Sequence, residues 1–220
     1  MMVSADHDPR RAGTIWMLGL DEEVPSIAPQ IPAVFCRLAL QSASELAGVM
    51  GNDTLPEIHK RFERGCHCYA ARVDGRLAAY GWVSFQEESI GELSLRVRLL
   101  PDEAYIWNCV TLPEYRRHYL YSALLVHIVS KLHADQFSRV WIGADLENIP
   151  SQRGIAHGGF IHVADLVVAR VLALRQVWVQ GQPNIADDLV EEARRVFLNN
   201  RDKVWSNLSP SMLSNQSNPL

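Results

Sequence analysis

The sequence predicts an α/β (α+β) domain in which helices flank a mixed, mostly antiparallel sheet. Consecutive apolar runs joined by turn signals between residues 66 and 99 predict hairpin strands. A strand–loop–helix–strand pattern over 104–145 predicts two parallel strands beside them. With 220 residues, 48% of them hydrophobic, the chain is long enough to bury a full core.

The first part of the chain predicts one strand and two helices. Residues 13–20 (GTIWMLGL) are apolar and predict a strand, and a proline-rich connector follows. The run from Val34 to Met50 has helical spacing and ends at Gly51-Asn52-Asp53. A second helix is expected over 56–64, because Pro56 suits a first helical turn and Gly65 suits its end.

The middle of the chain predicts antiparallel strands. Residues 66–73 and 76–85 flank Asp74-Gly75, which is a strong hairpin turn signal. A loop that carries Glu87 and Glu88 is expected next. The segment from Glu92 to Leu99 alternates polar and apolar residues, as a half-exposed strand does.

The remaining elements alternate strand and helix. After the strand at 104–110, Pro113 marks a loop, and the next helix has an apolar stripe: Tyr121, Leu124, Leu125, Ile128 and Leu132. Later segments predict a strand at 139–145, a short helix at 151–157, one long or two short strands from Ile161 to Val179, and a helix from Ile185 to Asn199.

These elements form one domain with short polar ends. Residues 1–12 are expected to be a disordered leader, since they lack the apolar core of a signal peptide. Residues 13–205 are expected to form the domain, and the Ser/Asn-rich residues 206–220 a flexible tail. The net charge of −4 argues against a nucleic-acid partner, and the chain has no apolar run long enough for a membrane helix.

The cysteines predict a cytoplasmic protein without a metal site. Cys66-His67-Cys68 lies in an expected strand, and no second cluster follows at zinc spacing. Reduced thiols are the better interpretation.

Arg116 and Arg117 stand at the expected start of a helix, where free N–H groups and the helix dipole favour anions. Such a place suits a phosphate or pyrophosphate. From these residues alone, a helix start with two solvated arginines is an equal alternative.

Two motifs together resemble the GNAT family of N-acetyltransferases, which use acetyl-coenzyme A (acetyl-CoA). The first is the run Val110-Thr111-Leu112-Pro113-Glu114-Tyr115-Arg116, followed by the helix start. The second combines Asn148, Ser151 and Gly159-Phe160 at the family's spacing. The motifs cover about 104–160, and the strand order supports the resemblance over 66–176.

The resemblance implies a GNAT-like mixed, mostly antiparallel sheet with a splayed parallel strand pair, 104–110 and 139–145, flanked by helices. Pantetheine would then bond to the open edge of the first strand near Val110 and Leu112. Arg116 and the amides of 117–122 would hold the pyrophosphate; these residues are Arg117, His118, Tyr119, Leu120, Tyr121 and Ser122. Asn148 and Ser151 would contact the pantetheine arm, although either residue could equally cap the following helix.

This chain departs from the family pattern at three positions. Tyr119 and Tyr121 stand where the family has the glycines that let phosphate approach the backbone. Ile155 stands where many members carry a tyrosine that protonates the departing thiolate, so this chain must do without that residue.

The resemblance implies an acetyl-CoA-dependent N-acetyltransferase that transfers the acetyl group directly to a small-molecule or peptide amine in a ternary complex. A backbone N–H near Cys109–Val110 would polarise the thioester. Glu103 is the first candidate for the base and Glu88 the second, although either could be a solvated surface carboxylate. Asn108 would line the acceptor cleft, and Tyr119 is a candidate for the missing acid.

Other interpretations stay open. Cys109 is a candidate nucleophile, but a buried structural cysteine is favoured because no partner base stands at a useful spacing. The altered glycines also fit a non-catalytic acyl-CoA-binding or sensing module, or a scaffold that has lost the cofactor. Trp82, Tyr105 and Trp107 form an aromatic acceptor pocket or belong to the core. Whether the chain is a homodimer is likewise open.

Overall fold

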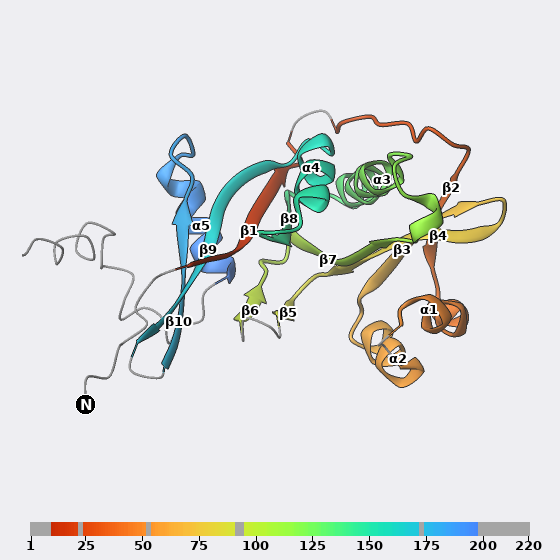
Figure 1. Ribbon diagram of the computed structural model, residues 1–220, viewed down its shortest axis with the longest axis horizontal. Helices are drawn as coiled ribbons and strands as arrows, with labels where there is room; N and C mark the ends of the chain where they lie inside the picture. The colour runs from red at the N-terminus through yellow and green to blue at the C-terminus, as the bar shows by residue number, and fades with distance from the viewer. Residues whose placement is uncertain (1–9, 22–23, 52–53, 91–94, 172–173, 198–220) are drawn as a thin grey trace, which may run out of the picture.

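The computed structural model describes residues 10–21, 24–51, 54–90, 95–171 and 174–197 (Figure 1). In chain order the elements are β1 (Arg10–Gly19), β2 (Val34–Leu38), the 3-10 turn η1 (Leu40–Ser42), α1 (Ala43–Val49), α2 (Leu55–Glu63), β3 (His67–Val73), β4 (Arg76–Ser84), β5 (Glu87–Ile90), β6 (Leu95–Arg98), β7 (Glu103–Thr111), the 3-10 turn η3 (Pro113–Tyr115), α3 (Leu120–Ala134), β8 (Arg139–Asp145), α4 (Ile149–His157), β9 (Ile161–Val171), β10 (Leu174–Gly181) and α5 (Asp187–Phe197).

Among the described residues, eight strands form one sheet in the order β10-β9-β1-β8-β7-β4-β3-β2. The pair β7–β8 is parallel, and the other neighbouring strands are antiparallel. This arrangement confirms the expected mixed, mostly antiparallel sheet. The first strand of the chain, β1, lies between β8 and β9, far from its sequence neighbour β2 (Figure 1).

Helices cover both faces of the sheet. α3 and α4 lie on one face, where the apolar side of α3 packs on β3, β4, β7 and β8. The opposite face is divided in two: α1 and α2 cover β3 and β4, and α5 with the β5–β6 hairpin covers β1, β8 and β9 (Figure 1). We call the side covered by α3 and α4 the α3–α4 face, and the half of the opposite side covered by α5 and the β5–β6 hairpin the α5 face. No helix among the described residues is long and apolar enough to cross a membrane.

Local signals explain most of the boundaries. Asp74 and Gly75 have φ values of 49° and 77°, as the turn between two paired strands requires. Thr54 and Glu57 form a capping box at the start of α2. The segment after Ile161 is two strands, β9 and β10, which pair with each other.

Three expectations need correction. Residues 34–38 are strand β2 and not helix, because they pair with β3; the helix is limited to Ala43–Val49. Glu87 and Glu88 lie in strand β5, which pairs with β6 in a separate two-stranded sheet. β1 begins at Arg10, so residues 10–12 belong to the domain. The rest of the expected leader and the tail at 206–220 lie outside the described residues.

Candidate active site at the splayed strands

The parallel strands β7 and β8 are paired at one end and apart at the other. Their register runs from Glu103 opposite Arg139 to Ile106 opposite Ile142 and stops there. Beyond this point β7 continues to Thr111 and β8 to Asp145. The splay that the GNAT resemblance implied is therefore confirmed, and it leaves the edge of β7 open to a ligand.

A cavity of about 260 Å³ fills the splay. The residues that line it come from both faces of the sheet: Gly13, Thr14, Ile90, Tyr105, Trp107, Asn108, Cys109, Tyr121, Ile142, Gly143, Ala144, Asp145, Asn148, Ser151, Leu166 and Phe197. Cys109, Ala144 and Tyr121 pack with the core of the α3–α4 face, whereas Tyr105, Leu166 and Phe197 belong to the core of the α5 face. The cavity thus connects one face of the sheet with the other.

The backbone groups at the open edge of β7 are not the expected ones, those of Val110 and Leu112. The Leu112 N–H donates to the Ala78 carbonyl of β4 at 2.9 Å, so it points away from the splay. Because backbone groups alternate along an antiparallel pair, those of Cys109 and Thr111 point toward the open edge, and those of Val110 point toward β4. The expectation that pantetheine bonds to Leu112 and Val110 does not fit this geometry, because the backbone groups of both residues face β4.

The two polar groups of Thr111 have different surroundings. Its carbonyl accepts a hydrogen bond from Arg116 Nε at 3.2 Å. Its hydroxyl oxygen is buried and has no hydrogen-bond partner among the described residues. A buried hydroxyl without a partner costs stability.

The loop before α3 keeps a backbone conformation that favours glycine. Arg117 and Tyr119 have φ values of 69° and 57°. This left-handed region costs a residue with a side chain about 1–2 kcal/mol relative to glycine. The Tyr119 ring is 49% exposed and packs on His157, with ring centroids 5.0 Å apart. The ring is therefore turned outward, and Tyr119 does not line the cavity, where an acid would be needed.

The start of α3 offers free amides. The first helical hydrogen bond runs from the Ala123 N–H to the Tyr119 carbonyl at 3.0 Å, so the amides of 120–122 precede it. The His118 carbonyl accepts from the Gln30 N–H at 2.9 Å, which ties the loop to the proline-rich connector. Arg116 and Arg117 are exposed beside these amides. The expected phosphate-binding groups are therefore close together.

Side chains of α3 and α4 meet at the cavity wall. The Tyr121 hydroxyl and Ser151 Oγ are 3.1 Å apart, and burial raises the pKa of Tyr121. A Cβ atom at Gly154 would lie 2.4 Å from the Tyr121 ring, so only glycine fits there. Ser122 donates to the Gly154 carbonyl at 3.0 Å. Tyr121, expected as part of an apolar stripe, thus brings a hydroxyl to the site.

Asn148 caps α4. Its Oδ1 accepts a hydrogen bond from the Ser151 N–H at 3.1 Å. The capping alternative is therefore observed, and both residues also line the cavity. The cap uses only the amide oxygen of Asn148, so its amide nitrogen can still donate to a ligand.

Asn108 and Cys109 form a bulge in β7 opposite Gly81. Pairing with β4 shifts between Tyr80 and Trp82, and Asn108 has a φ of 44°. With its amide oxygen facing α2, Asn108 accepts hydrogen bonds from Arg61 at 3.0 and 3.2 Å. Burial raises the pKa of the Cys109 thiol to about 12, so the thiol is protonated at neutral pH and a poor nucleophile.

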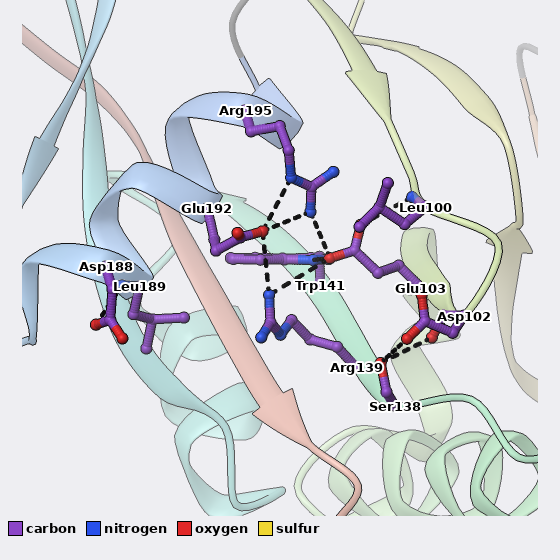
Figure 2. A network of polar contacts seen from close by, with 10 residues as sticks. All are labelled: Leu100, Asp102, Glu103, Ser138, Arg139, Trp141, Asp188, Leu189, Glu192 and Arg195. Carbon is purple, nitrogen blue, oxygen red and sulfur yellow. Dashed lines mark hydrogen bonds and ion pairs between the residues drawn. The ribbon is translucent and has the colours of Figure 1, made fainter.

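Glu103 lies at the closed end of the strand pair and does not line the cavity. Its carboxylate is buried and accepts hydrogen bonds from Arg195 Nη2 at 2.6 Å, Trp141 Nε1 at 3.3 Å and the Leu100 N–H at 2.9 Å (Figure 2). Arg139 Nη1 is 3.5 Å away. We therefore interpret Glu103 as a structural residue that joins α5 to the sheet.

Glu88 also lies outside the cavity lining, but it is connected to it. Its Oε2 is 2.7 Å from both Arg64 Nη2 and Ser84 Oγ. Ser84 Oγ in turn accepts a hydrogen bond from Trp107 Nε1 at 2.8 Å, and Trp107 lines the cavity. Glu88 thus positions an aromatic wall of the cavity.

The sequence patterns gave no site role to Asp145, to the Thr111 side chain or to the wall formed by β1. Asp145 is the one charged side chain among the described residues that line the cavity. Asp145 is the last residue of the strand 139–145. Its position was a usable signal, because ligands of open sheets bind at strand ends. Among the described residues, no group of three or more His, Cys, Asp or Glu side chains could hold a metal ion.

Comparison with solved structures shows the same fold. A tandem GNAT protein from the clavulanic acid biosynthesis pathway is 20% identical, with a TM-score of 0.53 over 82% of this chain and 57% of that one. A GNAT-family acetyltransferase from Streptococcus pneumoniae is 12% identical, with a TM-score of 0.50 over 69% and 98%. One from Colwellia psychrerythraea is 14% identical, with a TM-score of 0.49 over 81% and 59%. The chain thus spans less than two thirds of the length of the first and third of these proteins.

No curated protein matches the chain significantly. The profile of the acetyltransferase (GNAT) family matches residues 39–160, which is more than half of the chain and includes β7, α3, β8 and α4. The match therefore contains the splayed strands and the loop with the free amides. This chain belongs to the GNAT family of acetyltransferases, a family whose members transfer acetyl groups from acetyl-CoA.

Proposed function

We propose that this protein is an N-acetyltransferase that transfers the acetyl group of acetyl-CoA directly to an amine acceptor, with both substrates bound together. The observation that carries the proposal is the cavity that crosses the sheet at the splay. Its α3–α4 side adjoins the free amides of α3, and its α5 side leads to a separate wall. Two substrates could therefore approach one reaction point from opposite faces.

The residues on the α3–α4 side fit the cofactor. The amides of 117–122, together with Arg116 and Arg117, suit the pyrophosphate. The unpartnered Thr111 hydroxyl and the edge of β7 suit the amide groups of pantetheine. Asn148 and Ser151 line the same passage. The Thr111 carbonyl, which accepts one hydrogen bond from Arg116, has a second lone pair that a ligand amide can use.

The chemistry requires stabilisation of the developing oxyanion and removal of a proton from the amine. The bulge at Asn108–Cys109 turns backbone groups toward the cavity, where an N–H can polarise the thioester carbonyl. Neither Glu103 nor Glu88 reaches the lining, so we assign proton removal to water in the cavity or to Asp145, and no longer to these two residues. All four cysteines are free thiols, which fits a cytoplasmic enzyme.

Assays of binding and turnover test this function. Calorimetry with acetyl-CoA should give a measurable dissociation constant, and thiol release from acetyl-CoA should depend on an added amine. An absence of acetyl-CoA binding would exclude every cofactor-dependent role and leave the chain an interaction scaffold.

A non-catalytic acyl-CoA sensor is the second candidate, because Tyr119 and Tyr121 stand where the GNAT family carries glycines in this loop. Tyr121 in particular places its side chain in the cavity wall. Binding of acetyl-CoA without thiol release in the presence of any amine, amino acid or peptide would favour the sensor over the enzyme.

A further inference from the structure

We propose that the acceptor is a small cationic amine on an apolar or aromatic body, without a carboxylate beside the amine. This inference rests on the proposed acetyl transfer and specifies its substrate class. The α5 side of the cavity carries the inference. We call this side the acceptor pocket, and it is lined by Gly13, Ile90, Tyr105, Trp107, Gly143, Asp145, Leu166 and Phe197.

Strand geometry assigns these residues to one face. Side chains alternate along a strand, so Trp141, Gly143 and Asp145 of β8 point the same way, and Trp141 belongs to the core of the α5 face. The glycines agree with this assignment. A Cβ atom at Gly143 would lie 3.5 Å from Tyr105 Oη, and one at Gly13 would lie 3.7 Å from Leu166 Cδ1.

The walls of the acceptor pocket are apolar and rigid. Tyr105 packs edge-on against Phe197, with ring centroids 5.8 Å apart. The Trp107 ring is fixed by its hydrogen bond to Ser84. Gly13 and Gly143 add no side chain, which leaves space between these walls. An apolar or aromatic group would bury its surface here.

The charge in the pocket favours a cation. Asp145 is exposed, and its carboxylate forms no hydrogen bond or ion pair that we find among the described residues. An ammonium group at this position would be attracted, and a carboxylate would be repelled. The same carboxylate can accept the proton that the ammonium must lose before it attacks.

The nearby arginines are engaged elsewhere. Arg139 and Arg195 contact Glu103, and Arg11 is 3.2 Å from Asp165. The Arg61 guanidinium lies 4.5 Å from the Trp107 ring centroid and bonds to Asn108, but Arg61 does not line the cavity. No cationic side chain among the described lining residues would hold an amino-acid carboxylate.

The acceptor pocket also lies partly outside the region that the GNAT profile matches. Gly13, Leu166 and Phe197 are beyond residues 39–160, whereas the cofactor side is within them. The acceptor pocket therefore combines residues inside the matched region, among them Asp145, with residues outside it.

Matched pairs of acceptors test the proposal on the full chain. We expect kcat/KM for 2-phenylethylamine to exceed that for phenylalanine by about tenfold or more. We expect the same ratio between 3-methylbutylamine and leucine. Equal or better use of the amino acids would overturn the inference, point to Arg61 as the recognition group and leave the acetyltransferase function intact. Turnover of none of these acceptors, nor of peptide amines, would remove the proposed function and this inference together.

Asp145→Asn tests the charge directly. We expect Asp145→Asn to raise KM for 2-phenylethylamine about tenfold. The ratio of kcat/KM for 2-phenylethylamine to kcat/KM for phenylalanine should fall, and the dissociation constant of acetyl-CoA should not change. Glu147→Gln is the matched control, since it removes an exposed carboxylate two residues away that does not line the cavity. An Asp145→Asn variant that binds acetyl-CoA and keeps the wild-type preference would overturn the role of Asp145 and the inference with it.

Discussion

The two ends of the β7–β8 pair differ in how their polar side chains are surrounded. At the closed end, the buried Glu103 carboxylate is held by two arginines and an indole N–H (Figure 2). At the open end, the Thr111 hydroxyl and the Asp145 carboxylate have no partner among the described residues. A buried carboxylate needs such partners, whereas an exposed carboxylate is hydrated and stays accessible to a ligand. The same pair of strands thus carries a structural carboxylate, Glu103, and the carboxylate that we propose meets the acceptor, Asp145.

The largest effect is expected at the closed end. Glu103→Gln should lower the free energy of unfolding by about 2 kcal/mol, below the usual cost of breaking a buried ion pair because both arginines are partly exposed. Urea unfolding measures the change. Glu192→Gln, in the same network but more exposed, should change stability by less than about 0.5 kcal/mol. A loss of turnover by Glu103→Gln at unchanged stability would restore Glu103 as the base and reverse the comparison.

The next effect belongs to the loop at the open end. The double variant Arg116→Ala with Arg117→Ala should raise the dissociation constant of acetyl-CoA about tenfold, because two charge-assisted contacts to phosphate are lost. Calorimetry at low and high salt would show the difference shrinking as salt rises. Arg153→Ala, an exposed arginine on α4, serves as the control. Equal affinities of the double variant and the wild type would show that these arginines are only solvated.

Thr111→Val should change stability and binding in opposite directions. Without ligand, loss of the unpartnered hydroxyl should raise the free energy of unfolding by about 1 kcal/mol. With acetyl-CoA, the dissociation constant should rise about fivefold, because the ligand loses a hydrogen bond. Urea unfolding measures the free energy of unfolding, and calorimetry measures the dissociation constant of acetyl-CoA. Reduced stability in the absence of ligand would mean that the hydroxyl is already satisfied.

The smallest effect is expected at Tyr119. Tyr119→Gly should raise the free energy of unfolding by about 0.5 kcal/mol, since relief of the left-handed strain exceeds the entropy cost of glycine and the lost contact with His157. Acetyl-CoA should bind at least as tightly. Gln136→Gly makes the same backbone change at a φ of 64° after α3, and it should stabilise the fold without affecting acetyl-CoA. Weaker acetyl-CoA binding by Tyr119→Gly would instead give the tyrosine ring a role in holding the cofactor.

Sequence patterns predicted the parts of this molecule that depend on neighbouring residues. The Asp74-Gly75 turn and the capping box of α2 follow from local chemistry, and both are present. The motifs at 110–125 and 148–160 correctly indicated the splay, because a shared family pattern includes its tertiary arrangement. The helix predicted over 34–38 failed, since the spacing of so short an apolar run also suits a strand beside β3.

The roles of the carboxylates could not be predicted from the sequence. Glu103 and Asp145 are both acidic residues at strand ends, and nothing beside them in the chain separates their roles. The difference comes from α5, whose Arg195 reaches Glu103 from 92 positions further along. Likewise, only tertiary pairing directs the Leu112 amide to Ala78 and leaves Thr111 at the open edge.

The position of β1 has a consequence for biosynthesis. Its residues leave the ribosome well before the strands they pair with, since Gly13 pairs with Asp145 and Arg10 with Val168. The strand must therefore wait, without its partners, until most of the chain has been synthesised, and such long-range pairing is slow. Gly13 and Thr14 also line the cavity, so the cavity is complete only after β1 has been inserted between β8 and β9.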